Sequence, residues 1–220
     1  LMAIIPTALG LIIASALFDY ISPRFGNATS AAARAGFFLP QIIPISIAGL
    51  LWTWMLSSQT GIVNKIFTDW GHPEWAQNWL GDAKWAMFSV TIVLIWIQVG
   101  YTIVIFMSGL ARADQSVHEA AAIDGATEWQ TFRRIIFPAM QPVNIIVIVI
   151  TIIESLRAFD MIYIIYGGRG GLPILGVLVF ENIAGEGASM KGAAYAVILF
   201  LLSIVPILAY LQQQFREDVR

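Results

Sequence analysis

The sequence contains no cysteine and only two histidines, His72 and His118, which are far apart along the chain. Without cysteine there are no disulfides, no thiol catalysis and no cysteine-ligated metal sites. With two distant histidines, we expect no metal site built on several histidines. Charged residues are also scarce, at 12% of the 220 residues, and the net charge is −2. Because there is no basic excess, the sequence does not indicate nucleic acid as a partner.

Hydrophobic residues are unusually abundant. They make up 58% of the chain, and the mean hydropathy is +0.76. An average soluble domain is about 45–50% apolar and about 25% charged. A soluble core could not bury this much apolar surface, and disordered chains are poor in such residues. The composition therefore predicts a membrane protein.

Five apolar runs are roughly long enough to cross a hydrocarbon core of about 30 Å. They are residues 1–18, 37–56, 85–107, 143–166 and 193–210. We therefore predict an all-α, polytopic membrane protein with five membrane helices, and the length rule disfavours buried soluble helices. The first run lacks the basic start of a signal peptide. Because the chain begins without Met, we expect an earlier helix to be missing.

The distribution of Lys and Arg predicts the orientation of the spans. Seven of the 12 basic residues fall in 19–36, 108–142 and 211–220, and four fall in the alternate loops. We therefore place the first three segments, including the C-terminus, in the cytoplasm. On the outer side, 57–84 is predicted to be a loop with a short interfacial helix. Its tryptophans fit an aromatic belt at the lipid surface: Trp70, Trp75, Trp79 and Trp85.

The cytoplasmic loop contains two helix-start signals. Ser116 and Glu119 have the spacing of a capping box, and so do Thr127 and Gln130. Gly125 lies between them and can end the first helix with a turn. The pattern predicts two short helices joined by a glycine turn at the membrane surface.

Prolines mark the end of this loop. Pro138 is predicted to stop the second helix, and Pro142 to lie in the first turn of the next span. The first helix has a small face, Ala120–Ala122, that permits close approach by another protein, and the loop has no catalytic group. A docking element and an ordinary amphipathic connector fit the composition equally well.

The same residues resemble the EAA loop of binding-protein-dependent ABC importer permeases. The residues that match are Glu119, Ala120, Ala121, Asp124, Gly125, Ile135 and Pro138. The one departure is Phe137, where the family pattern has Leu. Residues 123–126 and 158–163 are similar to the maltose-transporter-type, carbohydrate-uptake branch. The resemblance implies a single permease domain over 1–220, six spans in the whole family, and an EAA coupling loop at 110–142.

The resemblance also implies a mechanism and a set of partners. The chain would be a non-enzymatic permease subunit in a bacterial or archaeal cell membrane, surrounded by lipid, and it would form half of a sugar pathway. Its partners would be a second permease subunit, a cytoplasmic ATPase dimer and an extracytoplasmic sugar-binding protein. The sequence has no Walker motif. ATP and Mg would therefore bind to the partner ATPase, and this chain would hold no cofactor.

Ionisable residues within a membrane span are costly and usually face a pathway or a partner. Glu154, Arg157 and Asp160 have a spacing that places them near one helical face. Glu154 lies roughly 16 Å from the predicted cytoplasmic start of its span, close to mid-depth. These three residues could form a structural ion network or contact a substrate.

Gln98 lies at a similar depth on the preceding span, with Trp96 and Tyr101 nearby. Amides, carboxylates and aromatic rings suit a polyol, although both aromatic residues could simply be packing residues. The family resemblance places sugar contacts at five positions: Gln98, Tyr101, Thr151, Glu154 and Ser155. An ion-coupled carrier or channel, with Glu154, Arg157 and Asp160 as a relay, is the alternative. For a membrane enzyme, the sequence offers neither a His-Glu-x-x-His motif nor a nucleophile elbow.

Overall fold

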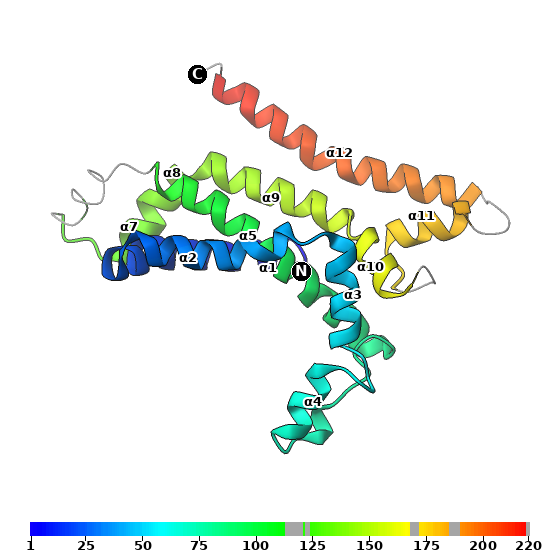
Figure 1. Ribbon diagram of the computed structural model, residues 1–220. Coiled ribbons are helices and arrows are strands. Elements are labelled where there is room, and N and C mark those ends of the chain that lie inside the picture. Colours follow the sequence, from blue (N-terminus) through cyan, green and yellow to red (C-terminus); the bar gives the residue numbers. More distant parts are fainter. Residues whose placement is uncertain (113–120, 122–123, 168–171, 185–189, 219–220) are drawn as a thin grey trace.

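The described elements of the protein are all helices (Figure 1). The computed structural model describes residues 1–112, 121, 124–167, 172–184 and 190–218, and no strand occurs within them. The helices are α1 (Ile4–Ser15), η1 (Ala16–Ile21), α2 (Ser22–Ile42), α3 (Ile45–Met55), α4 (Ile62–Asp69), η2 (Pro73–Trp75), α5 (Ala83–Leu110), α7 (Glu128–Thr131), η3 (Phe132–Ile136), α8 (Phe137–Ala139), α9 (Gln141–Leu156), α10 (Phe159–Ile165), α11 (Leu175–Ala184) and α12 (Met190–Asp218). Of these, η1 and η3 are π-helical and η2 is a 3₁₀ turn.

Three helical segments are long and apolar enough to cross a membrane: Ile4–Gly26, Ala83–Leu110 and Met190–Gln212. Two bent pairs bring the total to five if each pair is one span. The first pair bends by 94° between Ile42 and Ile45, and the second by 74° between Ala139 and Gln141. The predicted all-helical membrane fold is confirmed.

The segment 19–36 is helical, so the prediction of a loop there is wrong. Only Gly26, with φ 82°, interrupts the helical angles of α2. The alanine-rich sequence that follows Gly26 favours a helix. The predicted straight span 37–56 is instead sharply bent, because Ile43 precedes Pro44 and adopts an extended conformation with ψ 127°.

Helix α5 is the centre of the bundle and contacts α1, α2 and α9 (Figure 1). Glycines set the closest approaches. A Cβ at position 100 would collide with the carbonyl oxygen of Phe37 on α2, and one at Gly10 would collide with the hydroxyl of Thr102. Thr102 Oγ1 also donates to the carbonyl oxygen of Pro6 on α1, at 3.0 Å. Small residues and interhelical hydrogen bonds of this kind hold membrane helices together.

The buried apolar residues form two separate clusters along α5. The loop-side core joins α1, the second half of α5, η3 and α9: Ala14, Leu17, Ile103, Phe106, Met107, Leu110, Ile136, Met140 and Val147. The other cluster lies next to the cap, the segment 57–82, and is called the cap-side core. It joins α3, the first half of α5, α10 and α11: Ala48, Leu56, Ala86, Val90, Val93, Leu94, Ala158, Met161, Ile162, Ile165, Leu172 and Val177. The stretch of α5 between Leu94 and Ile103 belongs to neither buried cluster.

Residues 57–82 form a small cap beyond the end of α3 (Figure 1). The predicted short helix lies within this cap as α4. Asn64 organises this cap. Its Oδ1 accepts from Trp79 Nε1 at 2.6 Å and from the Gln77 amide at 3.1 Å, and its Nδ2 donates to the Gln77 carbonyl oxygen at 2.8 Å. Trp70 and Trp75 are exposed, whereas Trp79 is engaged by Asn64.

The close contact between α2 and α5 predicts that Gly100→Ala destabilises the protein. The added methyl group would force the two backbones apart, at a cost of roughly 1–3 kcal/mol by analogy with overpacked cores. Gly36→Ala is the matched control, because a Cβ at Gly36 meets nothing within 4 Å. Thermal unfolding in detergent should show a lower midpoint for Gly100→Ala only. Equal midpoints for the two variants would contradict the close-packing role.

Candidate functional site

A cavity of about 340 Å³ lies between α2, α5 and α9. Its polar lining comes from all three helices and from Arg157, the residue after α9: Gln41, Gln98, Tyr101, Thr102, Thr151, Glu154 and Arg157. Ligand pockets typically enclose about 300–1,000 Å³ and present a few polar groups on apolar walls. The cavity therefore has the size and lining of a small-molecule site.

The cavity lies at the boundary between the two cores. On α5, Gln98 and Tyr101 lie between Leu94 of the cap-side core and Ile103 of the loop-side core. On α9, Thr151 and Glu154 follow Val147 of the loop-side core. Gln98 lies roughly 22 Å from the start of α5, given a rise of about 1.5 Å per residue. The polar groups therefore form a layer near mid-depth.

Gln98 is the cavity residue with an unsatisfied hydrogen-bond acceptor. Its Oε1 is buried, yet it has no hydrogen-bond partner in the described structure. Buried acceptors are almost always paired, and leaving one unpaired costs about 1–3 kcal/mol. A donor supplied by a ligand or by water in the cavity would satisfy this oxygen.

The predicted contact residues do not all meet at this cavity. Gln98, Tyr101, Thr151 and Glu154 line it, but Ser155 does not, and its Oγ donates to the Ile152 carbonyl oxygen at 2.7 Å. The hydroxyl of Thr151 is already engaged as well. It is 2.9 Å from the Val147 carbonyl oxygen and 3.2 Å from Thr7 Oγ1.

Sequence reasoning missed Gln41, which reaches the cavity from α2. The available signal was an amide inside an otherwise apolar run. Trp96 is a packing residue, because its ring meets Trp52 edge-on with the ring centroids 5.5 Å apart.

The charged residues do not share one helical face. Helix α9 ends at Leu156, and α10 begins only at Phe159, so Asp160 lies on a different helix from Glu154. Arg157 lies at the break, and its Nη1 is 3.5 Å from Glu154 Oε1. Both side chains are substantially exposed, at 71% and 46%. The predicted three-residue face is therefore wrong for Asp160.

The predicted glycine turn at Gly125 is confirmed. The amide of Ala126 donates to the Ala121 carbonyl oxygen at 3.0 Å, and Gly125 has φ 74°. This is the Schellman arrangement, in which the residue with positive φ is usually glycine. Ala121 is buried and Asp124 is exposed. Ser116, Glu119 and Ala120 lie outside the described residues.

The second helix of the loop begins as predicted. The Gln130 amide donates to Thr127 Oγ1 at 3.3 Å, and the Thr127 amide donates to Gln130 Oε1 at 2.9 Å. Pro138 does not stop this helix, because it occupies the first turn of α8, where proline is tolerated. The chain instead bends one residue after α8, at Met140, and Pro142 lies in the first turn of α9 as predicted.

The second helix presents both a buried and an exposed apolar side. Ile136 and Met140 are each 3% exposed and belong to the loop-side core. Trp129 and Ile135, by contrast, are 66% and 37% exposed. The loop is thus anchored to the bundle and also leaves large apolar side chains uncovered.

Comparison with known proteins identifies relatives along nearly the whole chain. Residues 9–220 match the family described as binding-protein-dependent transport system inner membrane component. A probable ABC transporter permease of Pyrococcus horikoshii is 31% identical over 85% of this chain and 65% of its own length. The trehalose/maltose transport system permease MalF of Thermococcus litoralis is 30% identical over 96% of this chain and 70% of its own. The alpha-glucoside permease AglF of Rhizobium meliloti is 33% identical over 93% of this chain and 60% of its own.

The fold also matches a solved structure. A chain of a bacterial alginate ABC transporter, crystallised with an alginate pentasaccharide-bound periplasmic protein, superposes with a TM-score of 0.72. It is 20% identical, and the match covers 93% of this chain and 69% of that one. The chain spans slightly less than two thirds of the length of the first curated relatives it matches.

The unpaired oxygen of Gln98 predicts that Gln98→Leu leaves the thermal stability of the protein unchanged or raises it. The substitution removes a buried acceptor that has no partner. Thr102→Val is the comparison variant, because Thr102 does donate across helices, and its loss should cost about 0.5–1.5 kcal/mol. The measurement is the unfolding midpoint without added ligand. A loss in Gln98→Leu as large as that in Thr102→Val would mean that the amide is already paired.

Proposed function

Because the chain belongs to the binding-protein-dependent transport system inner membrane components, we propose that it is the permease subunit of an ATP-driven sugar importer. It would form half of the translocation pathway across the inner membrane. The single observation that supports this function best is the mid-depth cavity, which Gln98, with its unpaired oxygen, and Glu154 both line. Amide and carboxylate groups next to the Tyr101 ring offer hydrogen bonds and a stacking face to a hydroxylated ring.

Two relatives support a carbohydrate as the substrate. The permease of Thermococcus litoralis is named for trehalose and maltose, and that of Rhizobium meliloti for alpha-glucosides. Four of the five predicted sugar contacts line one cavity, and Gln41 adds a second amide there. Thr151 would contribute mainly its shape, because its hydroxyl is engaged by its own helix.

The loop around Gly125 is proposed to dock on a cytoplasmic ATPase dimer. Its exposed Trp129 and Ile135 offer apolar contact area, and its buried Ile136 connects the loop to the bundle. The coupling residues would be Glu119, Ala120, Ala121, Asp124, Gly125, Ile135 and Pro138. This placement puts the C-terminus in the cytoplasm, with ATP and Mg bound by the ATPase.

The remaining partners follow from the same proposal. A second permease subunit would complete the pathway, and an extracytoplasmic binding protein would deliver the sugar. The solved alginate transporter, whose complex includes a periplasmic binding protein, supports an assembly of this kind.

An ion-coupled carrier with a charge relay is the weaker alternative. A relay needs a continuous chain of titratable groups across the break between α9 and α10. Arg157 approaches Glu154, but Asp160 makes no hydrogen bond or ion pair with any described residue. The relay is therefore interrupted where it would need to be continuous.

Sugar contact at Glu154 predicts that Glu154→Gln lowers transport by about tenfold or more. A hydrogen bond to a charged group contributes about 1.5–3 kcal/mol. Ser155→Ala is the matched control, because that hydroxyl already donates to its own helix. The measurement is uptake of labelled maltose and trehalose into proteoliposomes, normalised to assembled complex. Normal uptake by Glu154→Gln would remove Glu154 from the substrate site, and a loss of assembly instead would assign it a structural role.

The φ of Gly125 predicts that Gly125→Pro uncouples the ATPase. Proline cannot adopt φ 74°, so the turn between the two loop helices would be lost. Asparagine tolerates that conformation, so Gly125→Asn should retain most of the coupling. Co-purification of the ATPase and sugar-stimulated ATP hydrolysis both report on this contact. Similar activity in the two variants would show that coupling does not depend on the turn.

A further inference from the structure

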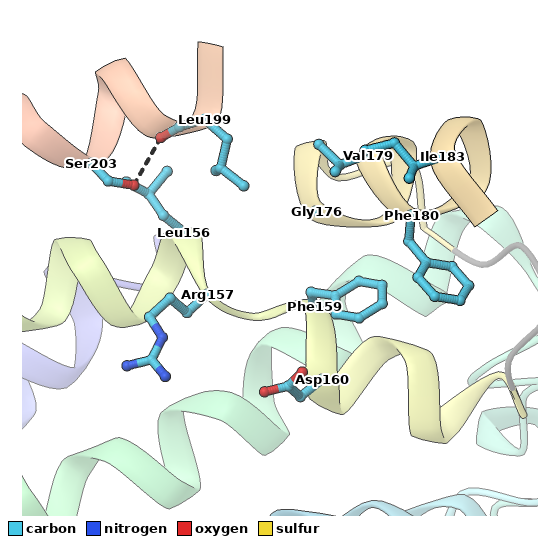
Figure 2. A pocket seen from close by; sticks show the side chains of 10 residues that line it. All are labelled: Leu156, Arg157, Phe159, Asp160, Gly176, Val179, Phe180, Ile183, Leu199 and Ser203. Carbon is cyan, nitrogen blue, oxygen red and sulfur yellow. Dashed lines mark hydrogen bonds between the residues drawn. The ribbon is translucent and has the colours of Figure 1, made fainter. Parts of the chain in front are cut away.

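A second, larger cavity of about 550 Å³ lies between the α9–α10 break, α11 and α12 (Figure 2). Its walls are mostly apolar, and Arg157 and Asp160 are the two charged residues that line it. Arg157 also lines the first cavity. The two cavities are therefore neighbours that share Arg157 as a lining residue.

The carboxylate of Asp160 has no partner in the described chain. It follows the break, is exposed, and makes no hydrogen bond or ion pair with a described residue. Figure 2 shows Arg157 before the break and Asp160 after it, and both residues line the second cavity. Charged groups at membrane depth are costly unless they face a partner or a water-filled cavity. The carboxylate of Asp160 therefore lacks hydrogen-bond donors among the described residues, and a bound molecule could supply them.

Aromatic rings lie beside these charges. The Phe180 ring, from α11, packs against the Phe159 ring of α10 at one side of the cavity, with the centroids 5.4 Å apart (Figure 2). Tyr163 joins them at 4.8 Å from Phe180. An acceptor, a guanidinium donor and apolar ring faces together suit a ligand with many hydroxyl donors and with C–H faces.

We propose that the second cavity is a carbohydrate subsite, which takes the ring adjoining the one held at Gln98 and Glu154. Asp160 would accept from sugar hydroxyls, Arg157 would lie between the two rings, and Phe180 would contact a ring face. This inference rests on the proposed transport function and makes it more specific. The two cavities together would then accommodate a substrate with at least two linked sugar rings.

The absence of native cysteine allows each cavity to be tested separately. Ile97→Cys places a thiol in the first cavity, and Ser203→Cys, an isosteric change, places one in the second. Labelling by a water-soluble methanethiosulfonate is followed in proteoliposomes that contain the complete transport complex. The probes are glucose, xylose, maltose and trehalose.

We expect maltose or trehalose to slow labelling about tenfold at both thiols, and the monosaccharides to slow it at Ile97→Cys only. Adding Asp160→Asn should abolish protection at Ser203→Cys and preserve it at Ile97→Cys. Glu181→Gln is the matched control, because Glu181 lies on α11 outside the cavity lining. It should leave both kinds of protection unchanged.

Three results would overturn the second subsite while leaving sugar transport in place. The first is protection by disaccharides at Ile97→Cys alone. The second is a thiol at Ser203→Cys that does not react even without sugar, because lipid or the second permease subunit covers the cavity. The third is equal protection of both thiols by a monosaccharide. No protection at either thiol, together with no uptake of any of the four sugars, would overturn the proposed transport function itself.

Discussion

The packing around α5 depends on how closely helix backbones can approach one another within lipid. Lipid chains are as apolar as the side chains they would replace, so burial alone does little to hold membrane helices together. At Gly100 the backbone of α5 meets the carbonyl of Phe37, and at Thr102 it reaches α1 by a hydrogen bond to Pro6. These contacts place α2 and α1 against the centre of α5, where the polar layer begins.

The two apolar cores explain why a polar cavity can exist at mid-depth. One core lies toward each end of α5, and no buried member of either core comes from the turn of α5 that carries Gln98 and Tyr101. The unpaired oxygen of Gln98 and the exposed carboxylate of Glu154 would be costly in a continuous core. They are tolerable where the two cores leave space that water or a ligand can occupy. The polar lining of the cavity thus follows from the gap between the two cores.

The sequence was sufficient to predict the membrane class, the capping box at Thr127 and the turn at Gly125. These features depend on composition and on residues close together in the chain. The break at Arg157 was missed, because nothing between 143 and 166 is a proline or a glycine and the run looks continuous. Gln41 was missed because its role depends on the bend at Pro44 and on the packing of α2 against α5. Long-range packing decides such positions, and local patterns do not report it.

The break between α9 and α10 has a mechanical consequence. Helix α5 runs without interruption through both cores, whereas α9 reaches the loop-side core and α10 belongs to the cap-side core. Only Arg157 and Ala158 join these two helices, and neither is inside a helix. A displacement of Ile136 and Met140 would therefore move α9 as a rigid helix. The change in angle between α9 and α10 would then occur at Arg157 and Ala158. Because α5 crosses both cores without a break, a change of angle at this joint would shift the loop-side core relative to the cap-side core.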